Sequence, residues 1–342
     1  MLTTKQSVLR RFWYPVMRLS HLDDGPKAFT LLGENIVLWR TADGGVACLK
    51  DRCCHRTAKL SLGYLEEGNI VCGYHGFTYR PDGVCIRIPQ RKNPENVSSA
   101  VRVPAYRAAE RYGYVWVALD EPLIGIPELP EASKPGFRQV DQFYETWNIG
   151  AFRLMENSFD SAHVSYVHRK TFGDVQRAQT DGHENIVQNP FGFETYHETP
   201  VKVRGNLAHK AVHTEGGETL RRTYATWYKP FVRRSSINYP HGLTHAIITC
   251  ATPMTDNVAM ILQWAYRNDR EEDVNTAEVI AFDRAITLED KAILESCEAD
   301  VPLATVDGEE MHMASDTPGV IMRRMMAKLL ADHGEAEQRR GA

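Results

Sequence analysis

Two Cys-His motifs in the first quarter of the chain constrain its fold more than any other feature. Cys53-Cys54-His55 is followed, after sixteen residues, by Cys72-Gly73-Tyr74-His75-Gly76. These residue types at this spacing predict two tight loops that meet around one metal centre. Gly73 and Gly76 allow the second loop to fold closely around that centre and to donate N–H groups to it. We therefore expect the two loops to cap a small β domain.

The ligand types favour an iron–sulfur cluster. Two thiolates suit one ferric ion, and two neutral imidazoles on a second iron raise the potential of the cluster to roughly −150 to +300 mV, against about −400 mV for an all-cysteine plant-type cluster. A Cys2His2 zinc site is the alternative, but it usually places both cysteines before both histidines. Cysteine and histidine alternate here, so the sequence predicts a [2Fe-2S] cluster held by Cys53, His55, Cys72 and His75.

The composition is that of an ordinary globular protein with room for two domains. The 342 residues are 43% hydrophobic and 25% charged, with a net charge of −4, which argues against nucleic acid or an anionic membrane as a partner. Arg10-Arg11 resembles a twin-arginine export signal, but His21 and Asp23 follow where an apolar segment would be needed. The seven cysteines are an odd number, and no apolar run approaches about 18 residues. We expect a cytoplasmic protein whose cysteines bind metal.

Turn signals and prolines divide the chain into two domains. Short apolar runs broken by Asp43-Gly44-Gly45, Glu66-Glu67-Gly68-Asn69 and Pro81-Asp82-Gly83 predict an antiparallel β domain over residues 1–121. Residues 122–136 are a proline-rich connection, and residues 137–342 form the second domain. Apolar periodicity in that domain predicts helices over 151–168, 275–296 and 321–330, strands between 191 and 267, and a frayed end from 334. The predicted fold class is α+β.

A second group of metal-binding residue types opens the second domain. Asp160, His163 and His168 have the spacing D-x2-H-x4-H. Two histidines and one carboxylate on one face of an iron leave positions for dioxygen and substrate. Asp160 and His163 share a face of a helix, so the carboxylate can orient the imidazole. His163 and His168 would point about 140° apart on a regular helix, so joint ligation requires a π-type widening or an early helix end near Tyr166.

The third ligand must come from far downstream. Two carboxylates, Asp283 and Asp290, interrupt one apolar helical stripe. An unpaired buried carboxylate is costly, and a bound metal relieves that cost. Periodicity does not choose between the two, and a surface salt-bridge pair is the simpler alternative. The whole stripe consists of Val279, Asp283, Ile286, Asp290, Ile293 and Leu294.

At these motifs the chain resembles the Rieske-type mononuclear non-haem iron oxygenases. The run from Tyr74 to Tyr79, followed by Asp82-Gly83, is similar to the second cluster loop of Rieske proteins. Residues 151–173 are similar to the iron segment of the subfamily that includes dicamba O-demethylase, caffeine N-demethylases and saxitoxin-pathway hydroxylases. Two positions depart from the Rieske pattern, because Cys54 is commonly proline and Phe77 is commonly tryptophan. We interpret Cys54 as a bystander rather than a ligand.

The resemblance implies a fold, two metal centres and roles for single residues. The expected fold is an N-terminal Rieske domain followed by a helix-grip, START-like catalytic domain with a curved antiparallel sheet. The expected cofactors are one [2Fe-2S] cluster and one Fe(II) per chain. Residues 288–296 resemble the family's ligand segment, which selects Asp290 beside His163 and His168. Asp160 is expected to bridge electron transfer from His75 of one subunit to His163 of the next, and Asn157 is expected to lie near the iron.

The resemblance also implies an activity and partners. The expected activity is hydroxylation or oxidative demethylation of a small aromatic, alkaloid or methylated amine, with NAD(P)H used indirectly through a separate reductase or ferredoxin. A homotrimer follows from head-to-tail assembly that closes into a ring. The alternatives are a cis-dihydroxylating dioxygenase and a Rieske electron carrier without catalytic iron, although a carrier would end near residue 120.

Substrate-binding and docking residues are less defined by the sequence. The sheet region offers candidates for the pocket, but strand register is unknown, so each is interpreted as structural: Asn206, His209, His213, Tyr239 and His245. Basic residues around the cluster motif could steer an acidic redox partner or form a solvated rim: Arg56, Arg80, Arg87, Arg91 and Lys92.

Overall fold

The computed structural model describes residues 1–177, 185–215, 217–306 and 309–340. Its internal contacts separate two compact units, residues 9–126 and residues 127–342, and the latter also includes residues 1–8. The division falls inside the proline-rich segment 122–136. That the first eight residues pack with the second unit was not predicted.

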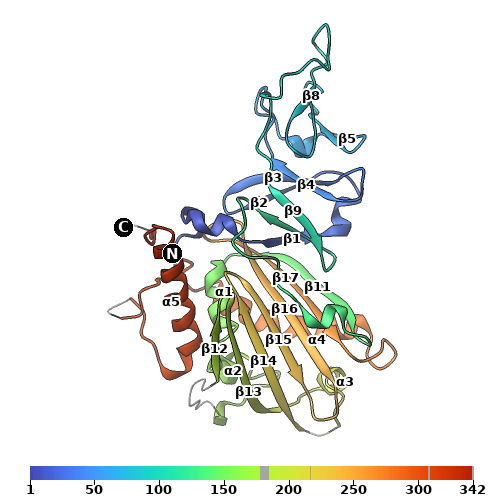
Figure 1. Cartoon of the computed structure of the whole chain (residues 1–342). Helices are drawn as coiled ribbons and strands as arrows, with labels where there is room; N and C mark the ends of the chain where they lie inside the picture. Colours follow the sequence, from blue (N-terminus) through green and yellow to red (C-terminus); the bar gives the residue numbers. More distant parts are fainter. Residues whose placement is uncertain (178–184, 216, 307–308, 341–342) are drawn as a thin grey trace. The chain divides into compact units, whose positions relative to one another are not determined.

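The unit of residues 9–126 consists of small antiparallel sheets (Figure 1). Their orders are β1-β10-β9, β2-β3-β4 and β5-β6-β7-β8. The three predicted turns connect β3 to β4, β5 to β6 and β7 to β8, which confirms the hairpin pattern. The strands are β1 Tyr14–Arg18, β2 Lys27–Leu31, β3 Glu34–Arg40, β4 Val46–Lys50, β5 Tyr64–Glu66, β6 Asn69–Val71, β7 Thr78–Tyr79, β8 Cys85–Arg87, β9 Arg107–Arg111 and β10 Tyr114–Ala118.

The second unit contains one seven-stranded antiparallel sheet (Figure 1). Its strand order is β11-β17-β16-β15-β14-β13-β12, so the first strand pairs with the last and the chain between β11 and β12 must cross over. The mixed fold with a β domain followed by a large antiparallel sheet confirms the predicted class. The strands are β11 Arg138–Trp147, β12 Ile186–Asn189, β13 Gly192–Lys202, β14 Glu218–Tyr228, β15 Val232–Asn238, β16 Thr244–Pro253 and β17 Ala259–Arg267.

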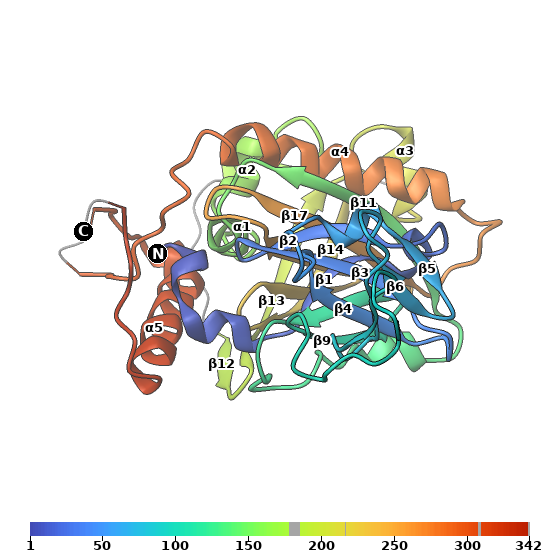
Figure 2. The same cartoon turned by 90° about the horizontal axis from the view of Figure 1, so that it is seen from above.

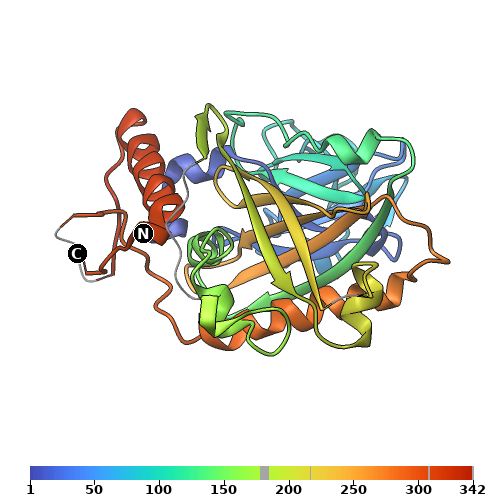
Figure 3. The same ribbon diagram turned by 90° about the horizontal axis from the view of Figure 1, so that it is seen from below.

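Long and short helices cover this sheet. The longest, α4 (Thr276–Leu294), begins with a capping box in which Asn275 and Glu278 satisfy each other's backbone N–H groups. It packs on β11 and runs along the sheet, with α3 (Asn206–Ala211) near its first turns and α2 (His163–Val167) near its last (Figures 2 and 3). This arrangement brings the C-terminal half of α4 beside the segment that carries the two candidate iron histidines.

Three predictions about the helices and the tail need correction. Residues 151–168 do not form one helix, because α1 (Ala151–Asn157) and α2 are separated by a turn. The last helix, α5 (Thr317–Asp332), starts before residue 321, with Pro318 in its first turn. Residues 335–340 were predicted to be frayed, but they are held in place. Gln338 O accepts a hydrogen bond from Leu2 N at 2.7 Å, and Arg339 pairs with Asp300. Among the helices of the described residues, none is both long and apolar enough to cross a bilayer.

Candidate metal centres and substrate pocket

The structure brings three of the predicted iron ligands together. The ligand atoms of His163, His168 and Asp290 all lie within 4.8 Å of one another. The Nε2 atoms of both histidines are 3.5 Å from Oδ1 of Asp290, and the two imidazole centroids are 5.2 Å apart. Asp283, the other candidate on the helical stripe, does not join this group.

The helix that begins at His163 ends before His168, so the two histidines can face one metal position although they are five residues apart. α2 ends at Val167, and His168 leaves the helical conformation with φ −91° and ψ 21°. Its carbonyl then accepts hydrogen bonds from the N–H groups of Thr171, Phe172 and Gly173, which turn the chain back on the helix. A Cβ at residue 173 would lie 2.3 Å from Val164 O, so only glycine fits there. The early helix end, the second of the two predicted distortions, is therefore the one found.

Each candidate iron histidine has a carboxylate beside Nδ1, the ring nitrogen that does not face Asp290. Nδ1 of His163 lies 3.5 Å from Oδ2 of Asp160, and Nδ1 of His168 lies 2.9 Å from Oε2 of Glu289. The prediction that Asp160 and His163 share a helix is wrong. Asp160 precedes α2 and accepts a hydrogen bond from Ala162 N. Burial opposes ionisation of Asp160, but His163 and nearby N–H groups outweigh it and lower the pKa of Asp160. Both rings thus present Nε2 to a metal.

Glu289 is a residue that the sequence did not single out. Its Oε2 also accepts a hydrogen bond from Thr171 Oγ1 at 2.9 Å, so the carboxylate is fixed between the turn after α2 and helix α4. The only signal in the sequence is its place directly before Asp290. A helix presents successive residues at about 100° to one another, which allows one to face the metal position and the other to face the ring behind it.

The residues present fit a ferrous ion. Oδ1 of Asp290, the atom that both Nε2 nitrogens approach, is buried without a hydrogen-bond partner among the described residues. Burial raises the pKa of Asp290, although the two histidines and the side chain of Asn157 partly oppose the shift. A cation would relieve this burial, and two imidazoles with one carboxylate are the donor set of non-haem Fe(II) sites with open positions. Asn157 lines the same pocket and is near enough to Asp290 to lower the pKa of its carboxyl.

Asp283 belongs to a buried polar network instead. Its Oδ2 lies 3.1 Å from Nε2 of His245 and accepts a hydrogen bond from the amide of Gln142. Gln142 accepts from Gln263 at 2.6 Å, and Thr249 donates to Gln263 at 3.0 Å. Hydrogen bonds therefore join four polar side chains beside the pocket, and His245 lies within ion-pair distance of one of them, Asp283. The predicted stripe is wrong only at its end, because the Ile293 side chain is 54% exposed.

The four cluster candidates lie on two loops of the same design in the N-terminal unit. In each loop the cysteine carbonyl accepts a hydrogen bond from the N–H four residues on, and the cysteine N–H donates to the carbonyl five residues on. Cys53 and Cys72 are 2% and 1% exposed, whereas His55 is exposed and His75 is half-buried. Their imidazole centroids are 4.6 Å apart, and His55 stacks on Phe77 at 4.8 Å. The sulfur ligands thus face the core and the imidazoles face outward.

The arrangement of these ligands favours a cluster over a single zinc ion. Tetrahedral zinc with bonds of about 2.0–2.3 Å needs its ligand atoms about 3.5 Å apart. Among the described residues, which include both loops, these four side chains do not form a group gathered closely enough to hold one ion. Burial raises the pKa of Cys72, and the thiol of Cys53 beside it adds to that rise. A thiol pair and an imidazole pair fit two irons better than one zinc.

Tyr79 contacts both adjacent cysteines. Its Oη is 3.0 Å from Sγ of Cys53 and 3.2 Å from Sγ of Cys54. Cys54 is an exposed residue whose Sγ contacts the buried Tyr79, and its interpretation as a bystander stays a prediction. Of the five basic residues considered for docking, Arg80 and Arg87 have acidic partners, Asp82 at 2.6 Å and Glu66 at 3.5 Å, which leaves less free charge for steering than the sequence predicted.

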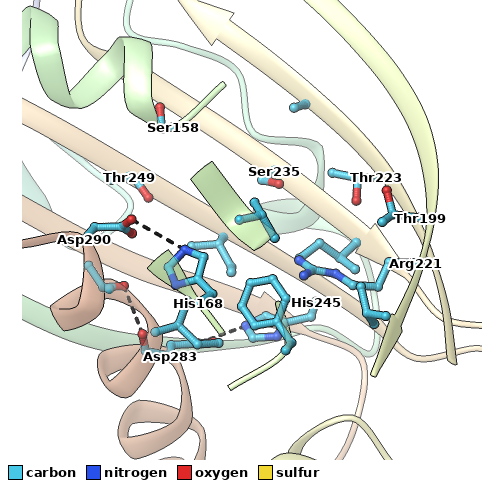
Figure 4. Close-up of a pocket in the computed structure, with 18 of the residues that line it drawn as sticks. Ser158, His168, Thr199, Arg221, Thr223, Ser235, His245, Thr249, Asp283 and Asp290 are labelled. Atoms are coloured by element: carbon cyan, nitrogen blue, oxygen red, sulfur yellow. Dashed lines mark hydrogen bonds and ion pairs between the residues drawn. The ribbon is translucent and has the colours of Figure 1, made fainter. Parts of the chain in front are cut away.

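A pocket of about 280 Å³ opens beside the three iron candidates (Figure 4). Alternate residues of β13, β14, β15 and β16 line it, as expected for one face of a sheet. Tyr239 and His245 are among its lining residues, whereas Asn206, His209 and His213 are not. His213 pairs instead with Asp269 at 3.2 Å. The sequence missed two arginines of this wall, Arg221 and Arg233.

Comparison with known proteins identifies the family. Residues 12–107 match the Rieske [2Fe-2S] domain, and residues 149–332 match the vanillate O-demethylase oxygenase C-terminal domain, which is more than half of the chain. The chain belongs to the Rieske non-haem iron oxygenases. A Rieske domain indicates a [2Fe-2S] cluster, and this oxygenase family implies a mononuclear iron. The alternative of a carrier without a catalytic domain is therefore wrong.

Several relatives match this Rieske oxygenase over nearly its full length. Methylxanthine N1-demethylase NdmA of Pseudomonas putida is 27% identical and is aligned over 98% of this chain and 93% of its own. The vanillate O-demethylase oxygenase subunit of Pseudomonas sp. (strain HR199 / DSM 7063) is 25% identical, with 95% of each chain aligned. The structure of Pseudomonas putida CBB5 NdmA with caffeine has a TM-score of 0.84 at 25% identity and covers 97% of this chain and 94% of its own. Dicamba monooxygenase bound to dicamba, at 24% identity and a TM-score of 0.80 over 95% and 98% of the chains, shares the fold.

Proposed function

We propose that this oxygenase hydroxylates or oxidatively demethylates a small organic substrate in the pocket beside His163, His168 and Asp290. The observation that carries the proposal is the convergence of these three ligand atoms within 4.8 Å at the wall of a largely apolar pocket. When bound there, a ferrous ion activates dioxygen. One oxygen atom enters a C–H bond of the substrate and the other leaves as water, which consumes two electrons and two protons supplied from outside. In a demethylation, the oxidised methyl group then leaves as formaldehyde.

The proposal gives each protein residue a separate task. Cys53, His55, Cys72 and His75 hold the [2Fe-2S] cluster. Glu289 accepts the Nδ1 proton of His168, and Asp160 lies beside Nδ1 of His163, so that both rings keep Nε2 free for iron. Asn157, which lies near Asp290 in the pocket lining, orients that carboxylate with its side-chain amide. The apolar side chains of the pocket exclude water around the substrate.

The electron supply is part of the same proposal. NAD(P)H is used through a separate reductase or ferredoxin that reduces the cluster. We further propose a head-to-tail homotrimer in which Asp160 links His163 to His75 of the neighbouring subunit. The support is the position of Asp160, which is partly exposed and has Oδ2 3.5 Å from Nδ1 of His163.

Metal analysis together with oxygen uptake tests the proposal. Purified holoenzyme should contain about three irons and about two sulfides per chain, and substrate should stimulate oxygen uptake in the presence of NADH and a reductase. His163→Ala should lose about one iron and all substrate-dependent uptake while the visible spectrum of the cluster stays unchanged. Two irons per chain without oxygen uptake would contradict the proposal. Labelled dioxygen distinguishes it from cis-dihydroxylation, because one labelled atom in the product fits a monooxygenase and two fit a dioxygenase.

A further inference from the structure

Two arginines in the pocket wall have no acidic partner within the part of the chain that the structure describes. Arg221 lies on β14 and Arg233 on β15, and both line the pocket. Their Nε atoms are buried without a hydrogen-bond partner among the described residues. In that part of the chain no carboxylate oxygen lies within 4.0 Å of either guanidinium group, the distance that defines an ion pair. Figure 4 shows Arg221 near Thr199 and Thr223, facing the same cavity as His168 and Asp290.

The arginine that follows each of these two in the sequence does have an acidic partner. Arg222 faces outward and pairs with Glu198 at 2.9 Å, and Arg234 faces away from the pocket and pairs with the buried Glu131. Each strand therefore carries one arginine with an acidic partner and one without. The unpaired one points into the pocket in both cases.

The contacts that these two pocket arginines do make leave their charge uncompensated. The guanidinium of Arg221 lies 5.2 Å from the ring of Phe172, and that of Arg233 lies 5.4 Å from the ring of Phe159. Arg233 also donates to Ser235 Oγ at 3.2 Å. An aromatic face and a hydroxyl attract a cation weakly compared with a carboxylate. Burial and the nearby Arg221 lower the pKa of Arg233 to about 10, which still leaves it charged near pH 7.

The acids of the pocket already have other partners. Asp160 faces His163, Asp283 faces His245, and Asp290 faces both iron histidines. Asp290 is close enough to Arg233 for each to shift the pKa of the other. The proposed iron takes the charge of Asp290, however, so that the loaded pocket has two unbalanced guanidinium groups. Two like charges in a partly enclosed pocket are costly unless an anion joins them.

We propose that Arg221 and Arg233 together bind the carboxylate of a one-ring aromatic acid. The inference rests on the proposed function and names its substrate class. A cavity of about 280 Å³ is larger than the cavity of about 150 Å³ that holds benzene, so one ring with substituents fits. The ring of Phe172 stacks on the imidazole of His168, with 4.9 Å between the two centroids. The guanidinium of Arg221 lies 5.2 Å from the centroid of the same Phe172 ring. The anion site is thus one aromatic side chain away from an iron ligand, a separation that one substituted ring can bridge.

Paired probes of equal shape and different charge test this site. Isothermal titration calorimetry of the holoenzyme near pH 7 compares para-methoxybenzoate with para-methoxybenzamide, which has the same shape but no charge. The wild-type protein should bind the benzoate at least about 10-fold more tightly. Arg221→Gln and Arg233→Gln should each weaken benzoate binding by about 10- to 100-fold and leave binding of the amide nearly unchanged. Arg→Lys at either position should give an intermediate loss, because lysine keeps the charge but not the two-pronged contact.

Two controls separate anion binding from a structural role. Arg222→Gln removes an arginine one residue away on the outer face and should not change benzoate binding. The melting temperatures of Arg221→Gln and Arg233→Gln should be equal to or above that of the wild type, because each removes an unpaired buried charge. A purely structural role predicts lower melting temperatures and equal losses for both probes.

The outcomes also separate this inference from the proposed function. Equal binding of the two probes, no binding of any methoxybenzoate isomer, or an equal effect of Arg222→Gln would overturn the anion site. Turnover of an uncharged substrate such as caffeine together with any of these results would leave the oxygenase function standing. Benzoate binding that depends on both arginines, without product or oxygen uptake, would support the anion site and count against the proposed function.

Discussion

Replacing Glu289 should weaken iron binding at His168 without disturbing the fold. One carboxylate oxygen of Glu289 accepts hydrogen bonds from His168 Nδ1 and Thr171 Oγ1, both at 2.9 Å. Hydrogen bonds to charged groups contribute about 1.5–3 kcal/mol and neutral ones about 0.5–1.5 kcal/mol. Glu289→Gln can keep a neutral bond, so iron affinity should fall by about 10-fold. Glu289→Ala removes the contact and frees the ring to rotate, so the loss should approach about 100-fold.

The assay is an anaerobic titration of Fe(II) into protein that retains the cluster but has lost the mononuclear iron. Glu298→Gln is the matched control, since Glu298 is an exposed carboxylate that follows the same helix. The reasoning fails if both Glu289 variants bind Fe(II) within about twofold of the wild type, or if the control loses as much affinity. Loss of the cluster absorbance would show that the substitution acts on the fold and not on His168.

Three further predictions concern other parts of the chain. Asp160→Asn should keep about three irons per chain but reduce NADH-driven product formation to near zero, because the carboxylate that links the two centres loses its charge; turnover near the wild-type rate would refute the bridge. Glu310→Gln should lower the free energy of unfolding at neutral pH by up to about 3 kcal/mol, because two arginines outweigh burial and lower the pKa of Glu310 from 4.5 to about 2. Since the folded-state pKa is depressed, this contribution is present above pH 4.5 and is lost as pH falls toward 2, so urea unfolding of variant and wild type should converge there. Cys54→Ser should leave cluster content unchanged, because the buried Cys53 already supplies the thiolate of the first loop; loss of the visible spectrum would make Cys54 a ligand.

Local patterns predicted the cluster loops and the early part of the iron site. In each loop the ligands are two or three residues apart, so spacing alone fixes which side chains meet. The same holds for Asp160 and His163, although the turn that joins them was mistaken for a helix. The break in that helix depends on Gly173 packing against Val164, a contact that no periodicity reveals.

Contacts between distant segments were harder to predict. Two carboxylates on α4 satisfied the same periodicity, and only the resemblance to a family selected Asp290. The structure shows why both can be buried, since Asp283 finds His245 and Gln142 while Asp290 finds the two iron histidines. Glu289 was missed for the same reason, because its partner His168 is 121 residues away. Long-range partners determine the role of a buried carboxylate, and one sequence does not contain them.

Strand register decides which arginines face the substrate. Arg221-Arg222 and Arg233-Arg234 are consecutive pairs, so a shift of one residue in either strand would exchange the inner arginine for the outer one. The observed pairing sets Ala225 opposite Ser235 and Thr223 opposite Ile237, and these four residues also line the pocket. The same alternation therefore turns one arginine of each pair inward, where it has no acidic partner in the described part of the chain, and the other outward to its acid. The charge of the substrate site thus follows from the register of two neighbouring strands.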